Sequence, residues 1–88
     1  MPAAAPPRLT VRVLLFAAYA ESLGAETLEV TVSSPATIGG VVDRLRALPG
    51  GRFLPSKPLC ARNLAHVDAA EPVADGDEIA ILPPLAGG

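Results

Sequence analysis

The residues with the clearest chemical potential stand at the end of the chain, where we expect Gly87 and Gly88 to finish in a free carboxylate. A carboxylate is a poor electrophile, but once its carbon is activated it can accept a nucleophile such as sulfur. Glycine has no Cβ, so a Gly-Gly backbone can pass a constriction that no side chain would fit. The pattern predicts a narrow probe whose tip carries an acyl group into another protein's active site.

The four residues before the glycines set the reach of this probe. Pro83 and Pro84 fix their own φ angles and cannot continue a ladder or a helix, so they should lift the tail off the body in extended form. We expect Leu85 and Ala86, with the two prolines, to set the direction of the tail and to bind partners. A plainer interpretation is a disordered terminus or an artificial linker.

The closing segment, Val73 to Gly88, favours the probe. A turn, Asp75-Gly76-Asp77, precedes an apolar strand-like run, Glu78 to Leu82, and the proline and glycine pairs follow in order. This segment resembles the end of the MoaD/ThiS sulfur carriers, small ubiquitin-like proteins that carry sulfur as a C-terminal thiocarboxylate. The ending Pro-Pro-Leu-Ala-Gly-Gly is most similar to the small subunit of molybdopterin synthase. The resemblance extends more weakly over residues 10–88.

The resemblance implies a function. Gly88 would be adenylated and converted to a thiocarboxylate that donates sulfur to a cyclic pyranopterin in molybdenum cofactor biosynthesis, while Gly87 would pass the constriction. The chain would bind no cofactor, since ATP would be used by an adenylating enzyme of the ubiquitin-activating type. The other partner would be the large subunit of molybdopterin synthase, in a heterotetramer.

The sequence itself shows no catalytic machinery. It contains no nucleotide-binding loop, no Cys/His pair and no paired carboxylates in a predicted cleft. We therefore expect a protein substrate, or sulfur-donor subunit, rather than an enzyme, with the catalytic groups on partner proteins.

Two alternatives share the same acyl-adenylate. The chain could carry sulfur for thiazole or another thiolated product, although the proline pair favours molybdopterin. It could also be a ubiquitin-like modifier that forms isopeptide bonds with target lysines.

The docking surface is less well defined than the tail. Phe16 and Leu85 are the best candidates for partner contacts, but core packing for Phe16 and a tail contact for Leu85 explain them equally well. Ile81 and Leu82 stand where close relatives would be expected to carry bulkier, often aromatic residues.

Composition limits the function classes. With 88 residues, 50% hydrophobic but only 3% aromatic, the chain should fold as one domain around an aliphatic core. A net charge of −2 with scattered basic residues argues against nucleic acid, and no apolar run could span a membrane. Val13 to Ala20 imitates a signal peptide, but Met1 to Pro7 contains no Lys or Arg, so we expect a cytoplasmic protein.

Four other residues could suggest a reactive thiol, a metal site or a phosphate site, but a structural role is favoured for each. Cys60 lies in a strand-like run and is expected to be a buried apolar residue rather than a reactive thiol. His66 lacks a second metal ligand and suits a surface turn. Gly39 and Gly40 lack the Lys of a phosphate loop, and we expect them to let a helix approach the sheet closely.

Periodicity predicts the elements that position the tail. Strands are expected at 10–17, 26–32, 59–63, 66–67 and 78–82, with a short helix at 18–23 that Gly24 ends. A longer helix should begin at Thr37, or alternatively at Ser34-Pro35, and end at 49–51. Its apolar stripe comprises Ile38, Val41, Val42, Leu45 and Leu48.

This order predicts an α+β fold, and the resemblance implies a ubiquitin-like β-grasp. We expect a mixed sheet of four to five strands with one main helix, and the last strand beside the first in mid-sheet. The predicted divisions are a disordered N-terminal extension (1–8), the β-grasp domain (9–82) and the flexible C-terminal Gly-Gly tail (83–88). Phe53 should cover one end of the core.

Overall fold

The computed structural model describes residues 7–84. Seven strands are formed: β1 (Arg8–Leu15), β2 (Thr27–Ser33), β3 (Ala36–Thr37), β4 (Leu59–Arg62), β5 (Ala65–Val67), β6 (Pro72–Val73) and β7 (Glu78–Leu82). The helical elements are α1 (Ala17–Leu23), α2 (Ile38–Arg46) and the 3₁₀ turn η1 (Gly51–Phe53).

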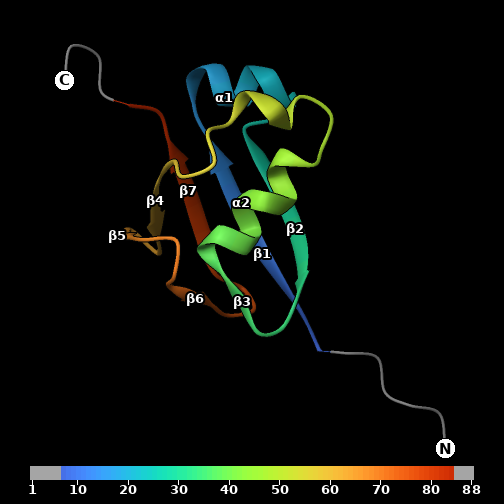
Figure 1. The fold of residues 1–88 in the computed structure, drawn as a ribbon, viewed down its shortest axis with the longest axis vertical. Helices are drawn as coiled ribbons and strands as arrows, with labels where there is room; N and C mark the ends of the chain where they lie inside the picture. Colours follow the sequence, from blue (N-terminus) through green and yellow to red (C-terminus); the bar gives the residue numbers. More distant parts are fainter. Residues whose placement is uncertain (1–6, 85–88) are drawn as a thin grey trace, which may run out of the picture.

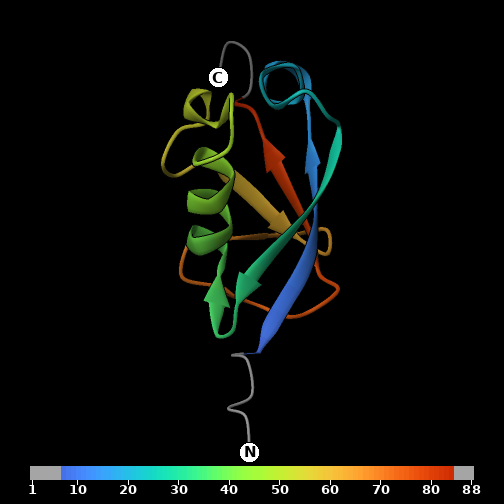
Figure 2. The same cartoon turned by 90° about the vertical axis from the view of Figure 1, so that its right-hand side faces the viewer.

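Five strands form a mixed sheet in the order β2-β1-β7-β4-β5. β1 pairs antiparallel with β2 and parallel with β7, so the last strand lies beside the first, as predicted. Figure 1 shows α2 lying across one face of this sheet, and Figure 2 shows the helix and the sheet as two layers. The predicted α+β fold, a ubiquitin-like β-grasp, is confirmed.

The core lies between α2 and the inner face of the sheet. Strand residues alternate, so Val11 and Val13 of β1 and Ile79 and Ile81 of β7 are buried while their neighbours face outward. The helix contributes its apolar stripe, namely Ile38, Val41, Val42 and Leu45. The core is aliphatic apart from Tyr19 and Cys60, in agreement with the composition.

Thr37 is the N-cap of α2, and its hydroxyl accepts a hydrogen bond from the Gly40 N–H at 3.2 Å. The alternative start at Ser34-Pro35 is wrong, because these residues precede β3. The helix ends at Arg46 rather than at 49–51, so Leu48 packs against the core from beyond its last turn. Gly24 ends α1 with φ 78°, as expected.

Several details differ from the sequence predictions. β1 begins at Arg8 and ends at Leu15, two residues before the predicted limit, because α1 starts at Ala17. The predicted loop after Val67 contains β6, which pairs with β3. Phe53 is 60% exposed and contacts Tyr19 edge to face, so it covers the core only in part. The close approach at Gly39 is to the backbone of Ala69, not to the sheet.

Candidate functional site

The root of the tail is held in the middle of the sheet. β7 pairs with β1 on one side and with β4 on the other, and Ile79 and Ile81 are fully buried. Leu82 and Pro83 are half-buried, while Pro84 is exposed. In Figure 1, β7 and β1 point to the same end of the molecule, where α1 lies. The predicted site residues Leu85, Ala86, Gly87 and Gly88 lie outside the described residues.

A polar cluster fixes the beginning of β7. The Asp77 carboxylate, only 8% exposed, accepts hydrogen bonds from the Ala74 N–H (2.7 Å), the Asn63 side chain (3.1 Å) and Arg62 (3.3 Å). The bond from the Ala74 N–H is the main reason that the pKa of Asp77 lies below its ordinary value, with smaller contributions from Asn63 and Arg62. Arg62 also pairs with Glu71 at 3.1 Å. The cluster therefore ties the β4–β5 turn to the start of the tail-bearing strand.

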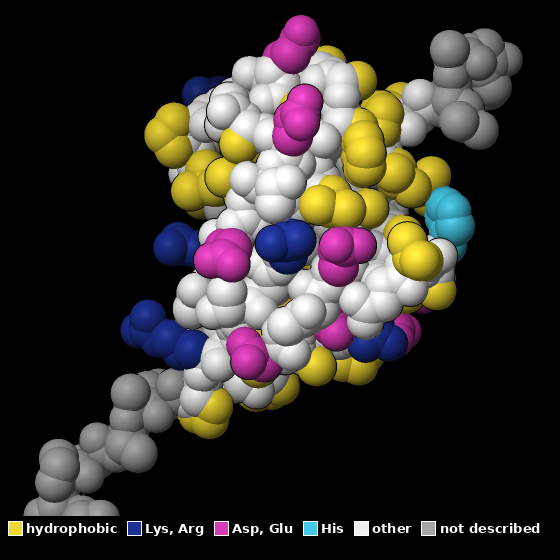
Figure 3. All heavy atoms as spheres, turned by 180° about the vertical axis from the view of Figure 1, so that it is seen from behind, with side chains coloured by type: hydrophobic (Ala, Val, Ile, Leu, Met, Phe, Trp, Pro, Cys, Tyr) yellow, Lys and Arg dark blue, Asp and Glu magenta, His cyan; other side chains and the backbone are white. Residues whose placement is uncertain are grey.

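The outer face of the sheet carries an apolar surface beside the root of the tail, which we term the tail-root patch. It comprises Leu14, Phe16, Leu64, Ala80 and Leu82, together with exposed Leu59, which pairs with Leu82, and Ala61, which is itself only 8% exposed. A shallow groove of about 290 Å³ lies within it, bordered also by His66 and Glu78. Figure 3 shows hydrophobic side chains gathered on this face at the upper right, while charged side chains occupy its middle and lower parts. Exposed apolar patches of this kind mark interaction sites.

Leu64 is the most exposed member of the patch. It is 92% exposed and adopts φ 76°, next to Asn63 at φ 49°. Two positive φ angles in a two-residue loop are typical of a type I′ hairpin turn, whose second position strongly favours glycine. A leucine in this position is strained, and its side chain gains almost nothing from burial. Leu64 therefore contributes more to the surface than to stability.

Phe16 lies directly after β1 and is 43% exposed at the margin of the tail-root patch. It is absent from the buried core, so of its two predicted roles the structure favours the surface one. Ile81 points into the core, whereas Leu82 borders the groove. Of these two neighbours, only Leu82 is placed to contact a partner.

Cys60 is 2% exposed in β4, where burial raises the pKa of its thiol to about 11. This confirms the packing interpretation, since the thiolate is the reactive form. His66 is exposed on β5, which confirms the strand predicted at 66–67 and a surface position, although not the predicted turn. Within residues 7–84, His, Cys, Asp and Glu side chains form no group of three that could hold a metal ion. No helix in this range is long and apolar enough to cross a membrane.

The sequence model of the ThiS family matches residues 13–88. The chain belongs to the ThiS family. The resemblance to the MoaD/ThiS sulfur carriers is thereby confirmed, and the matched region extends through the two final glycines.

Relatives of this ThiS-family chain include the molybdopterin synthase sulfur carrier subunit of Escherichia coli. It is 33% identical over 81 residues, which cover 89% of this chain and 99% of the relative. The crystal structure of SAMP1 from Haloferax volcanii is similar with a TM-score of 0.76 and 31% identity, covering 90% of this chain and 99% of that one.

A third similar structure is a protein–protein complex of subunits 1 and 2 of the molybdopterin-converting factor from Helicobacter pylori. The matched chain has a TM-score of 0.66 and 23% identity, covering 91% of this chain and 100% of that one. At this identity the likeness shows the shared fold.

Sequence reasoning did not find most of the tail-root patch or the Asp77 cluster. Leu14 and Ala80 could have been placed on the outer face by the alternation along β1 and β7, where every second residue is buried. Leu64 could have been noticed as an apolar residue after Asn63, between two short strands. The assignment of Asp77 required the three-dimensional contacts, because its partner Arg62 lies on a different strand.

Proposed function

We propose that this chain is a sulfur carrier whose Gly88 is adenylated, converted to a thiocarboxylate, and used to donate sulfur to a cyclic pyranopterin in molybdopterin biosynthesis. The observation that carries this proposal is the sequence match through Gly87 and Gly88, which four residues separate from a strand that is paired on both sides in the sheet. The relative from Escherichia coli, named as the sulfur carrier subunit of molybdopterin synthase, supports this choice of pathway.

The proposed chemistry forms the thiocarboxylate in three steps. The Gly88 carboxylate attacks the α-phosphorus of ATP, pyrophosphate leaves, and an acyl-adenylate forms. The terminal sulfur of a persulfide donor attacks the acyl carbon and AMP leaves, giving an acyl disulfide. A thiol then reduces that disulfide, which releases the donor as a mixed disulfide and leaves the thiocarboxylate. The partner proteins supply ATP binding, the persulfide and the pyranopterin site, and the chain supplies the acyl carbon.

The position of the tail-root patch supports docking of these partners. A protein bound over Leu14, Leu64 and Leu82 would cover the outer face at the point where β7 ends. The tail would then enter the partner beside the interface, with Pro83 and Pro84 directing it. The subunit complex from Helicobacter pylori supports the large subunit of molybdopterin synthase as a partner. The resemblance to the sulfur carriers further implies a heterotetramer with that subunit, and a second partner that is an adenylating enzyme of the ubiquitin-activating type.

The first test is the intact mass of the full chain after incubation with ATP, an adenylating enzyme and a persulfide donor. We expect one oxygen to be replaced by sulfur, with fragmentation mapping the change to Gly88. Deletion of Gly88 should abolish loading and leave the circular dichroism spectrum unchanged. Normal loading of this truncated chain would overturn the proposal.

A second variant separates passage of the tail from folding. Gly87→Val adds a β-branched side chain at the predicted constriction, so it should reduce sulfur transfer to the pyranopterin far more than it changes the melting temperature. Gly87→Ala is the control, with a smaller expected loss of transfer. Equal transfer by all three proteins would show that Gly87 passes no constriction.

A ubiquitin-like modifier remains the second candidate, because SAMP1 from Haloferax volcanii, a modifier by name, is 31% identical. In that case Gly88 would form an isopeptide bond with a lysine. The same experiment distinguishes the two functions when a lysate is added. A covalent adduct to lysine without stable thiocarboxylate would favour the modifier, whereas sulfur transfer without adducts would favour the carrier.

A further inference from the structure

A second surface lies at the β2 edge of the sheet, where β1 separates β2 from β7. β2 is an edge strand, and a groove of about 480 Å³ separates it from α2. The groove is bordered by Thr31, Val32 and Ser33 of β2, Gly40, Asp43 and Arg44 of α2, Ala47, and Arg8. The proposed sulfur-carrier function uses none of these residues.

The backbone of β2 can accept another strand. Leu15 N–H donates to the Glu26 carbonyl at 2.8 Å, which fixes the alternation of the β1–β2 ladder. By that alternation, the backbone groups of Thr27, Glu29, Thr31 and Ser33 face away from β1. Within residues 7–84, no other element pairs with β2. An extended peptide could therefore hydrogen-bond along this edge.

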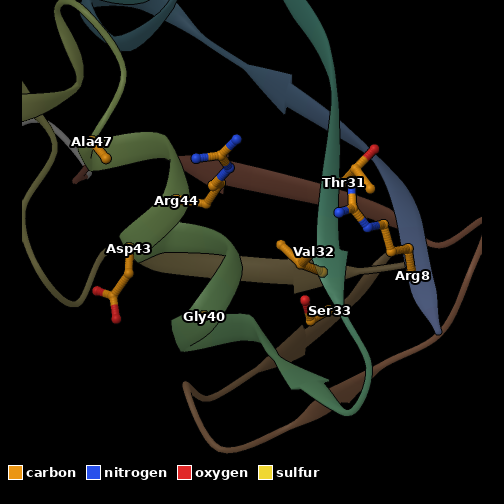
Figure 4. Close-up of a pocket in the computed structure, with 8 residues that line it drawn as sticks. All are labelled: Arg8, Thr31, Val32, Ser33, Gly40, Asp43, Arg44 and Ala47. Carbon is orange, nitrogen blue, oxygen red and sulfur yellow. The ribbon is translucent and has the colours of Figure 1, made fainter. Parts of the chain in front are cut away.

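Two guanidinium groups give the groove its charge preference. In Figure 4, Arg8 and Arg44 extend into it from opposite sides, whereas the carboxylate of Asp43 points away. Within the described part of the chain, the only ion pairs are those of Arg62, so neither arginine is held by a carboxylate there. The chain as a whole is acidic, which makes this local basic pair distinctive. Arginine favours carboxylates because two N–H groups of the planar guanidinium can donate in parallel to the two carboxylate oxygens.

The floor of the groove favours small side chains. Gly40 and Ala47 leave space along α2, and half-buried Val32 offers an apolar contact. Glu29 and Glu26 place negative charge farther along the edge, so acidic residues of a ligand belong at the Ser33 end. The ligand that fits these features is an extended peptide. It would carry small side chains toward α2 and carboxylates near the two arginines.

We propose that the groove between β2 and α2 binds an extended acidic segment of a partner protein as an added strand on β2. Small or β-branched residues of the segment would pack against Val32 and Ala47. Two adjacent carboxylates would meet Arg8 and Arg44, because neighbouring residues of a strand point to opposite faces. Since this surface is separate from the tail-root patch, the chain could hold such a segment while its tail is engaged elsewhere.

The test titrates the full-length ¹⁵N-labelled chain with a blocked hexapeptide of valine and threonine that contains one adjacent pair of glutamates. The control peptide has lysines in place of the glutamates. We expect the glutamate peptide to shift the amide signals of Thr31, Ser33 and Gly40, and to slow hydrogen exchange at Thr31 and Ser33. The lysine peptide should cause neither change.

Charge reversal supplies the matched variants. Arg44→Glu and Arg8→Glu should each weaken the glutamate peptide by about tenfold or more, equivalent to about 1.4 kcal/mol. Arg52→Glu makes the same charge change at an exposed residue of η1 and should leave affinity unchanged. All three substitutions are at exposed positions, so circular dichroism should show the native fold.

Three results would overturn the proposal. The peptides could bind equally well, or the shifts could map to the tail-root patch, or no shift could occur at millimolar peptide. If sedimentation instead showed a dimer of the free chain, with amide exchange at Thr31 and Ser33 already slow and unchanged by the peptide, the occupant of the edge would be a second copy of this chain. The sulfur-loading assay does not depend on any of these outcomes.

Discussion

The two faces of β7 make the most instructive comparison in this molecule. Ile79 and Ile81 on the inner face are fully buried against α2, whereas Ala80 and Leu82 on the outer face border the tail-root patch. Four consecutive residues thus anchor the fold on one side and contribute to an apolar surface on the other. The difference shows how a small domain can expose an apolar surface on its last strand without weakening its core.

This division depends on register. Since strand side chains alternate with a period of two, a shift of one residue in β7 would exchange its inner and outer faces. The start of the strand is fixed twice by Asn63, whose N–H donates to the Glu78 carbonyl and whose side-chain oxygen accepts the Glu78 N–H. Asp77 holds Asn63 in turn. The polar cluster therefore keeps the patch on the outside.

The largest expected effect comes from the inner face. Ile81→Ala removes a fully buried side chain and should lower the free energy of unfolding by about 2–5 kcal/mol. Leu82→Ala, the adjacent control, should cost less than half as much but should weaken binding to the large subunit of molybdopterin synthase by about tenfold or more. Chemical denaturation and calorimetric titration measure the two quantities. Equal stability losses with unchanged binding would refute the division between the faces.

The next effect concerns the cluster that sets the register. Asp77→Asn should lower the free energy of unfolding by about 1–3 kcal/mol, because a charge-assisted acceptor of the Ala74 N–H and of Arg62 is lost. Asp43→Asn is the matched control at an exposed position of α2 and should change stability little. Urea denaturation at neutral pH measures both variants.

The stability difference between wild type and Asp77→Asn should also depend on pH. The folded pKa of Asp77 is lowered, so its stabilising contribution is complete above the unfolded value of about 3.9 and is lost as the pH falls through the folded pKa. The stability difference between wild type and Asp77→Asn should therefore stay constant from pH 7 to about pH 5 and shrink below about pH 4. A difference that grew in acid would contradict the assigned contacts.

The sequence was sufficient for the parts of the fold that repeat a simple period. The limits of β1, β2 and β7 were predicted to within two residues, and the predicted apolar stripe of α2 is buried. The apolar run from Ile79 to Leu82 matches the central place of β7 in the sheet. Thr37 was identifiable as an N-cap because a hydroxyl just before an apolar stripe can accept a hydrogen bond from a free N–H of the first helical turn. These features depend on residues that are close together in the sequence, so the sequence alone was enough to predict them.

What could not be predicted depends on residues that meet from distant segments. β3 and β6 have only two residues each, too few to show a period, and they pair with each other across 35 to 37 positions of sequence. The tail-root patch draws on β1, β4, β7 and the β4–β5 turn, so no single segment reveals it. Phe16 was found from the sequence because it is a large apolar residue at a strand end, but its exposure came from the structure.

The smallest effect on stability is expected at Leu64. This residue should also separate a role in binding from a role in folding most clearly. Leu64→Gly relieves a positive φ while adding freedom to the unfolded chain, so the free energy of unfolding should be unchanged or rise by up to about 1 kcal/mol. Binding to the large subunit should nevertheless fall, because a nearly fully exposed apolar side chain is removed from the patch. Leu64→Asn, which also tolerates positive φ, is the control for strain and should weaken binding similarly. If both variants bound normally, Leu64 would lie outside the docking surface; if both lost stability, the turn rather than the surface would explain this leucine.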